Sequence, residues 1–160
     1  LSELIFLLLI ISQFVAYFSY TNLATVAAVE MGDLLQYADL GAGTLLAAFV
    51  LVVFLVGILM PQIIPKWALF APVFVPLFMR LGIEPDAVLA AYRVGDSPSN
   101  VINPLMPYFA LIVTFVRRYD KDAGVGTVIA LMLPYAVALL AVWTALLLAW
   151  YAFGIPFGPG

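Results

Sequence analysis

The sequence has no cysteine and no histidine, and only 9% of its 160 residues are charged. Without these two residue types the chain cannot form disulfides, thiolate or imidazole metal sites, or the Ser-His and Cys-His pairs of nucleophilic enzymes. A soluble domain would carry about 25% charged residues. Because 66% of the residues are hydrophobic, we expect the chain to be embedded in a lipid membrane.

Basic charge is also scarce. Six Lys and Arg residues stand against nine Asp and Glu residues, which gives a net charge of −3. No basic stripe is present, so we exclude nucleic acid as a partner. One basic cluster, RRYDK at 117–121, predicts a cytoplasmic loop, and the linker around Glu84 then faces outward.

Long charge-free runs divide the chain into membrane segments and predict an all-α membrane protein, with residues 1–160 as a single membrane-embedded fragment. We expect spans at 4–29 and 127–153. The chain opens with an apolar run but has no basic n-region, so we interpret it as a piece of a longer membrane protein rather than as starting with a signal peptide.

Residues 43–80 form two apolar arms joined by a proline-rich turn. The apolar run of the second arm, 67–79, is too short to cross a bilayer as a helix, which predicts a re-entrant helical hairpin. Such backbone persists in a membrane only where protein or a water-filled cavity satisfies its polar groups. Lys66, at the tip, is expected to extend its ammonium into that cavity.

Residues 86–116 predict a broken (unwound) helix. The helix should start near Asp86 and end near Val94, where the polar run GDSPSN begins, and a second helix should begin near Pro104 or Leu105. The exposed N–H groups of one half-helix suit a carboxylate, and the carbonyls of the other suit a cation. The break is tolerable only beside water, an ion or a polar ligand.

Side chains at the break supply hard oxygen donors of the type that Na⁺ uses. An ionisable residue inside a membrane is a functional candidate by default, so Asp96 is the expected coupling group for Na⁺ or a proton. The alternative is that Asp96 only balances Arg93, three residues earlier on the same helix. The candidate ion and coupling residues are Asp96, Ser97, Asn100, Asn103 and, from a polar interruption of the first span, Asn22, with Na⁺ held at Asp96 and Asn100.

Two strings, KWALFAPVFVP at 66–76 and AAYRVGDSPSNVINPLMPYF at 90–109, resemble the AbgT family of bacterial inner-membrane transporters, and QFVAYFSYTNLA at 13–24 matches more weakly. The resemblance implies a homodimeric, multi-pass secondary transporter with an inverted repeat, of which this chain is the C-terminal portion and carries one half. It implies p-aminobenzoyl-glutamate, a fragment of folate metabolism, as substrate, and efflux of p-aminobenzoate-like sulfonamides, hence antibiotic resistance. Family residues that line the substrate route fall on Trp67, Pro85, Arg93, Asp96 and Pro104.

The chain departs from the family pattern at the hairpin tip. The family has an Asn and then a Gly-Ser-x-Ser run before Lys-Trp, whereas residues 57–65 read GILMPQIIP here. Gly57 stands where the Asn is expected, and bulkier residues replace the small polar ones. This departure bears on the ion site more than on the substrate site.

We therefore predict a transporter and not an enzyme, with no cofactor beyond the coupling ion. Its substrate is an aromatic carboxylate bound by Arg93, and Asp96 handles H⁺ or Na⁺. Import and export would use the same site. A scaffold membrane domain is the alternative, and an intramembrane hydrolase would need Lys66 or an aspartate as base for a serine nucleophile.

Overall fold

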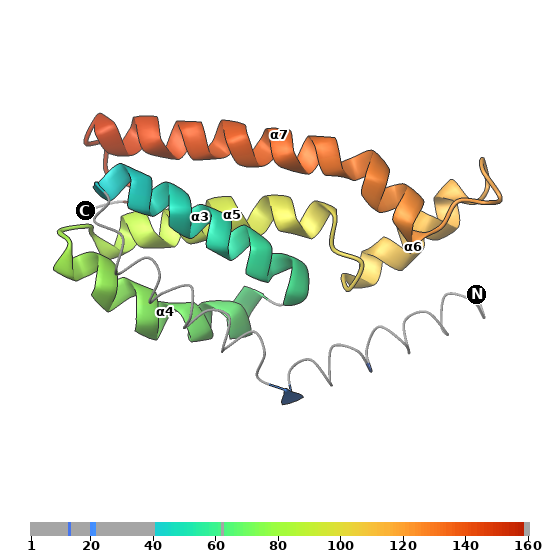
Figure 1. Ribbon diagram of the computed structural model, residues 1–160, viewed down its shortest axis with the longest axis horizontal. Helices are drawn as coiled ribbons and strands as arrows, with labels where there is room; N and C mark the ends of the chain where they lie inside the picture. Colours follow the sequence, from blue (N-terminus) through green and yellow to red (C-terminus); the bar gives the residue numbers. More distant parts are fainter. Residues whose placement is uncertain (1–12, 14–19, 22–40, 62, 159–160) are drawn as a thin grey trace.

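The computed structural model describes residues 13, 20–21, 41–61 and 63–158, and every regular element within 41–158 is an α-helix. The all-α prediction is therefore confirmed for this part of the chain. The expected span at 4–29 and its candidate ligand Asn22 lie outside the described residues, apart from 13, 20 and 21. The helices are α3 (Ala42–Leu59), α4 (Ile63–Arg80), α5 (Pro85–Val101), α6 (Pro107–Val116) and α7 (Val125–Ala152) (Figure 1).

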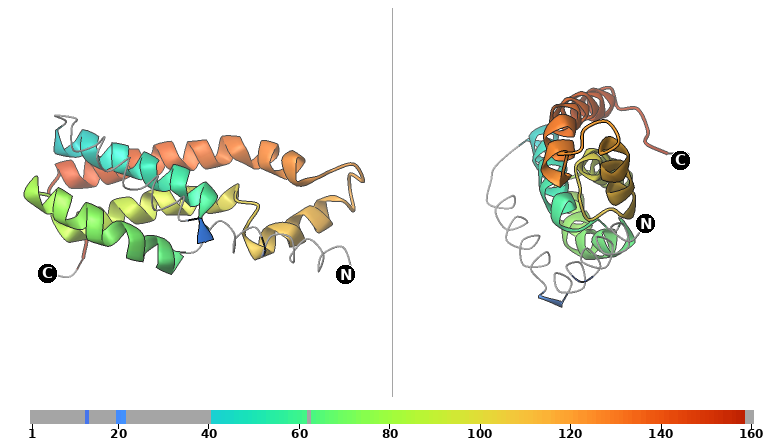
Figure 2. Two further views of the ribbon diagram at one scale, coloured as in Figure 1. Left: turned by 60° about the horizontal axis from the view of Figure 1, so that its bottom comes forward. Right: turned by 90° about the vertical axis from the view of Figure 1, so that its right-hand side faces the viewer.

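Helices α3 and α4 run in opposite directions (Figures 1 and 2). They pack through aromatic rings. The ring of Phe49 on α3 lies 6.0, 4.7 and 5.2 Å, centroid to centroid, from those of Phe70, Phe74 and Phe78 on α4. The fourfold spacing places these three rings on one face of α4. All four rings are fully buried, so this aromatic contact joins the two helices.

The lengths of these helices correct one argument from the sequence. Helix α4 has 18 residues and begins at Ile63, before the apolar run at 67–79. Helix α3 also has 18 residues, and α3 and α7 are the two described helices that are long and apolar enough to cross a membrane. The length of α4 therefore gives no support to a re-entrant arm.

The turn between α4 and α5 follows from local sequence. Gly82 has a φ of 78°, a left-handed conformation that glycine adopts without strain. The amides of Gly82 and Ile83 bond to carbonyls in the last turn of α4. Helix α5 then begins with Pro85 at its first position, where a missing N–H costs no hydrogen bond. This start lies one residue before the predicted one.

Helix α5 does not end near Val94, so the predicted position of the break is wrong. The helix continues through the polar run to Val101, with Pro98 inside it. The hydroxyls of Ser97 and Ser99 donate to the carbonyls of Arg93 and Asp96, at 2.9 and 2.7 Å, so these polar groups are satisfied within the helix. The interruption lies at residues 102–106, between α5 and α6.

Gly95 serves packing rather than helix ending. A Cβ at this position would lie 2.4 Å from the carbonyl oxygen of Val50 and 2.8 Å from the Cβ of Val53, both on α3. Helices α3 and α5 therefore approach so closely that a side chain at 95 has no room. Helix α7 lies along this pair on the other side from α4 (Figures 1 and 2).

Candidate functional site

Four polar side chains are buried among the described residues, and they gather at one place. The C-terminal end of α3, the first turns of α4 and the last turns of α5 meet there. We call these four residues the buried polar cluster. Its members are Lys66, Ser99 and Asn103, whose exposed fraction is 0%, and Asp96, whose exposed fraction is 2%.

The centre of the cluster is an ion pair between Lys66 and Asp96. The ammonium of Lys66 donates a hydrogen bond to Oδ1 of Asp96, which follows it by 30 residues. A buried charge requires such a partner, because removing it would leave the other charge without compensation. The alternative in which Arg93 pairs with Asp96 is wrong: Asp96 is paired with Lys66, and Arg93 is exposed.

Gly57 gives the cluster its space. A Cβ at Gly57 would lie 2.2 Å from Oγ of Ser99 and 3.3 Å from Nζ of Lys66. Any side chain at this position would collide with Ser99 and crowd the ammonium. The departure from the family pattern at position 57 therefore coincides with the place where Lys66 reaches Asp96.

Asn103 ties the interruption after α5 to the end of α3. Its Nδ2 donates to the carbonyl oxygen of Gly57 at 2.8 Å, and its Oδ1 accepts from the amide of Leu105 at 2.9 Å. The first bond satisfies a carbonyl in the last turn of α3, which has no partner within the helix. The second stabilises the turn that leads into α6. Tyr108 adds a 3.1 Å bond from its hydroxyl to the carbonyl of Asn100.

Asn100 carries an acceptor without a donor. Its Oδ1 is buried and makes no hydrogen bond within the described structure. Asn100 follows Asp96 by four residues on α5, so the two side chains are neighbours on one helix face. An amide oxygen beside a carboxylate fits a small cation such as Na⁺. The described residues contain no group of three or more acidic, His or Cys side chains that would hold a multivalent metal.

The candidate substrate residues differ in exposure and position within the described residues. Trp67 is half-buried, with its ring 4.8 Å from that of Tyr92, and Pro104 is half-buried in the turn after Asn103. Pro85 is exposed at the start of α5, 11 residues or about 16 Å along the helix from Asp96.

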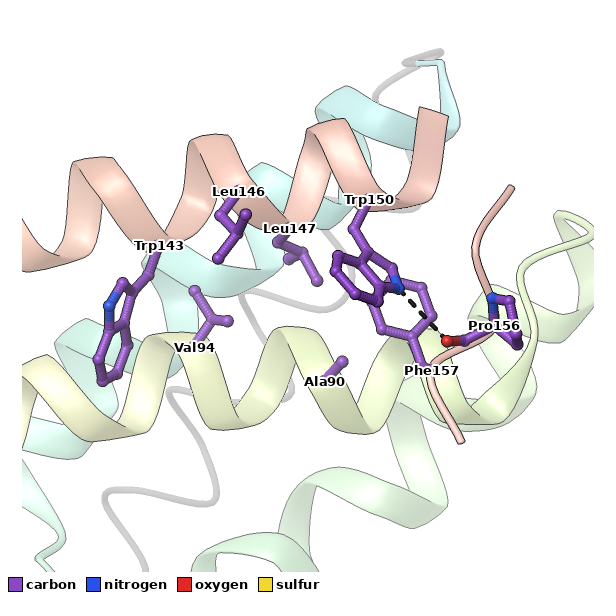
Figure 3. Close-up of a pocket in the computed structure, with 8 residues that line it drawn as sticks. All are labelled: Ala90, Val94, Trp143, Leu146, Leu147, Trp150, Pro156 and Phe157. Carbon is purple, nitrogen blue, oxygen red and sulfur yellow. Dashed lines mark hydrogen bonds between the residues drawn. The ribbon is translucent and has the colours of Figure 1, made fainter. Parts of the chain in front are cut away.

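A separate apolar pocket lies between α5, α7 and the segment after α7 (Figure 3). Its volume is about 320 Å³, and the indole Nε1 of Trp150 donates to the carbonyl of Pro156 across 3.3 Å at one end. No charged side chain lines it, so it does not suit a carboxylate. Its lining consists of Ala90, Val94, Trp143, Leu146, Leu147, Trp150, Pro156 and Phe157.

Two features of the site were not predicted from the sequence: Lys66 as the partner of Asp96, and Gly57 as the residue that makes room for it. One signal was present. Lys66 is flanked by apolar residues on both sides, and a cation in such a stretch needs a counter-charge. The spacing between Arg93 and Asp96 offered a nearer cation, so Arg93 was the partner that the alternative interpretation of Asp96 named.

The sequence model that describes the AbgT putative transporter family matches residues 1–160, the whole chain. The chain belongs to this family. It is 38% identical over 153 residues to the p-aminobenzoyl-glutamate transport protein of Escherichia coli K12, covering 94% of this chain and 30% of that protein. The AbgT resemblance read from the two strings around Lys66 and Asp96 is thus confirmed.

Two solved AbgT-like structures are similar to the chain. The YdaH transporter of Alcanivorax borkumensis gives a TM-score of 0.74 at 47% identity, over 93% of this chain and 32% of that one. MtrF of Neisseria gonorrhoeae, which represents a class of antimetabolite efflux pumps, gives a TM-score of 0.69 at 42% identity. The match covers 94% of this chain and 30% of the MtrF chain. The chain spans about a third of the length of these relatives. They are transporters and not enzymes, as the sequence predicted, so the hydrolase alternative is set aside.

Proposed function

We propose that this chain is the C-terminal portion of a secondary active transporter in the bacterial inner membrane, driven by a gradient of H⁺ or Na⁺. Its substrates would be p-aminobenzoyl-glutamate or related p-aminobenzoate and sulfonamide compounds, with export of antimetabolite drugs among its activities. The E. coli relative, a p-aminobenzoyl-glutamate transport protein, supports the substrate class, and MtrF, which represents a class of antimetabolite efflux pumps, supports export. Export of sulfonamides would link the protein to antibiotic resistance and to folate metabolism.

The buried polar cluster is the observation that carries this proposal. A chain with only 9% charged residues keeps a lysine and an aspartate buried together at the meeting point of three helices. Replacing a buried ion pair by apolar residues is often neutral or stabilising, so packing does not require it. Ionisable residues inside a membrane typically line ion or substrate pathways. A transporter needs such a pathway, and a scaffold domain does not.

The residues divide into two groups by chemistry. Arg93 is an exposed guanidinium one turn from Asp96 and would bind the substrate carboxylate through paired hydrogen bonds. Trp67 would stack on the aromatic ring, and Pro85 and Pro104 would shape the route. The coupling cation would bind at Asp96 and Asn100, with Ser97, Asn103 and Asn22 as further polar groups near its path.

The membrane arrangement is part of the proposal. The antiparallel helices α3 and α4 would form a re-entrant hairpin, and α5 with α6 a helix interrupted at 102–106, together one half of an inverted repeat in a multi-pass homodimer. Cysteines introduced at Ile64 and Glu84, in a version of the full-length protein from which any native cysteine has been removed, test the hairpin with an impermeant thiol reagent. Glu84→Cys should react from outside. If Ile64→Cys reacts only from the cytoplasmic side, as freely as a loop residue, α3 and α4 cross the membrane and form no hairpin.

Transport is tested with the full-length protein in proteoliposomes and radiolabelled p-aminobenzoyl-glutamate. We expect an imposed Na⁺ or proton gradient to drive movement of the substrate, and sulfonamides to compete with it. The Asp96→Asn variant should still bind substrate but lose gradient-driven movement. Folded wild-type protein that moves neither compound under either gradient would contradict the proposal.

A further inference from the structure

The carboxylate proposed to bind the coupling cation already has a cation beside it. The ammonium of Lys66 donates to Oδ1 of Asp96, and both side chains are buried. An ion from solution would have to approach the same carboxylate against the charge of Lys66, and like charges repel strongly where water is absent. Lys66 and a coupling cation therefore compete for Asp96.

The surroundings of Lys66 resemble a cation site more than a helix start. Lys66 lies near the beginning of α4, where the positive end of the helix dipole disfavours an ammonium. Its Nζ instead lies close to Gly57, in the last turn of α3, where carbonyls without helical partners carry negative partial charge. The ammonium thus lies between a carboxylate and the C-terminal end of a helix.

A vacant acceptor lies one turn along α5. Oδ1 of Asn100 is buried without a donor, and an unsatisfied buried acceptor carries an energetic cost. A cation held between Asp96 and Asn100 would satisfy it. Lys66 has its hydrogen bond to Asp96 instead, so this acceptor remains open while the ion pair is intact.

We propose that Lys66 is a tethered counter-ion that controls access of the coupling cation to Asp96. In one state of the transport cycle Lys66 neutralises Asp96, and in the other it withdraws and Na⁺ binds at Asp96 and Asn100. Lys66 is a positioning residue in this scheme, because it acts on the cation through Asp96. The inference rests on the proposed coupling role of Asp96.

The first test measures Na⁺ binding without any transported substrate. Thermal unfolding of the purified full-length protein is followed in NaCl, KCl and choline chloride at equal ionic strength. In Lys66→Met the apparent Na⁺ affinity should rise about tenfold or more, because a competing state no longer reduces the fraction able to bind. Lys66→Met/Asp96→Asn should lose the Na⁺ response, and Lys121→Met, at an exposed lysine, should match the wild type. Equal responses to the three salts, or an unchanged Na⁺ affinity, would overturn the proposal.

The second test uses the wild-type protein and holds even if Lys66→Met fails to fold. This chain has two lysines, Lys66 and Lys121, and acetylation of each is followed by mass spectrometry. Na⁺ that displaces Lys66 from Asp96 should increase acetylation of Lys66 relative to choline, while Lys121 stays constant. No increase at Lys66 would overturn the inference. Neither test depends on substrate movement, so a failure here is distinguishable from a failure of the transport assay.

Discussion

Replacing Gly95 by alanine should push α5 away from α3. The new Cβ would lie 2.4 Å from the carbonyl oxygen of Val50, whereas ordinary contact begins at 3.4 Å. The helices would therefore have to separate by about 1 Å to restore ordinary contact, the difference between these two distances. The obstacle is a backbone atom, so no rotation of a side chain can relieve it.

The magnitude follows from two opposing terms. Alanine stabilises a helix interior over glycine by about 0.5–1 kcal/mol. Overpacking of a well-packed contact costs about 1–3 kcal/mol, so the net destabilisation is about 0–2.5 kcal/mol, with a central value of about 1 kcal/mol. If the separation extends along the pair, the 2.8 Å bond from Asn103 to Gly57 lengthens to about 3.8 Å and is lost. Transport should then fall together with stability.

The assay compares Gly95→Ala with Gly126→Ala in the full-length protein. Gly126 lies in the first turn of α7, and a Cβ there would meet no atom within 4 Å, so this control should be neutral or slightly stabilising. Melting temperatures are read from the loss of the monodisperse peak in size-exclusion chromatography after heating. A Gly95→Ala protein that melts at or above the temperature of the control would refute the close-packing argument.

Three further predictions concern the cluster and its surroundings. Lys66→Met should lower the free energy of unfolding by about 3–5 kcal/mol, because it leaves Asp96 buried and unpaired, and adding Asp96→Asn should restore most of this free energy. Denaturant titration in detergent measures both variants. A double variant as unstable as the single variant would contradict the pairing. Asn103→Ala removes a donor and an acceptor that are both in use and should cost about 2–3 kcal/mol, while Asn100→Ala, which removes an unpartnered oxygen, should cost clearly less in the same titration. Arg93→Ala should raise the KM for substrate about tenfold or more. Arg93→Lys should recover only part of this loss, because a lysine ammonium cannot replace the paired hydrogen bonds of the planar guanidinium. An unchanged KM in proteoliposome uptake would exclude Arg93 from the substrate site.

Much of the helical architecture could be read from local sequence. The last helix was expected at 127–153 and lies at Val125–Ala152, because a long charge-free apolar run has few alternatives to a helix in a membrane. The turn before α5 was also close, since Gly82 and Pro85 favour the end of one helix and the start of the next. These features depend on neighbours within a few residues.

The break after α5 shows where local reasoning failed. Glycine, serine and proline close together read as a helix breaker, yet the helix continues to Val101. In this run Gly95 is required by the backbone of α3, and Ser97 and Ser99 bond to their own helix. Whether such residues break a helix or let it pack depends on what lies opposite, and this cannot be read from the run itself.

The sequence by itself determined the membrane setting, the helical class, the AbgT family and the presence of an unusual aspartate in an apolar chain, because each follows from composition or from contiguous motifs. Only the tertiary structure decided which cation neutralises that aspartate. Arg93 is three residues away and Lys66 is 30 residues away, and sequence distance favoured the first. The crossing of α3, α4 and α5, and the space left at Gly57, bring the ammonium of Lys66 to Asp96 and leave Arg93 exposed. A contact between distant residues depends on how whole helices pack, and no local pattern specifies that.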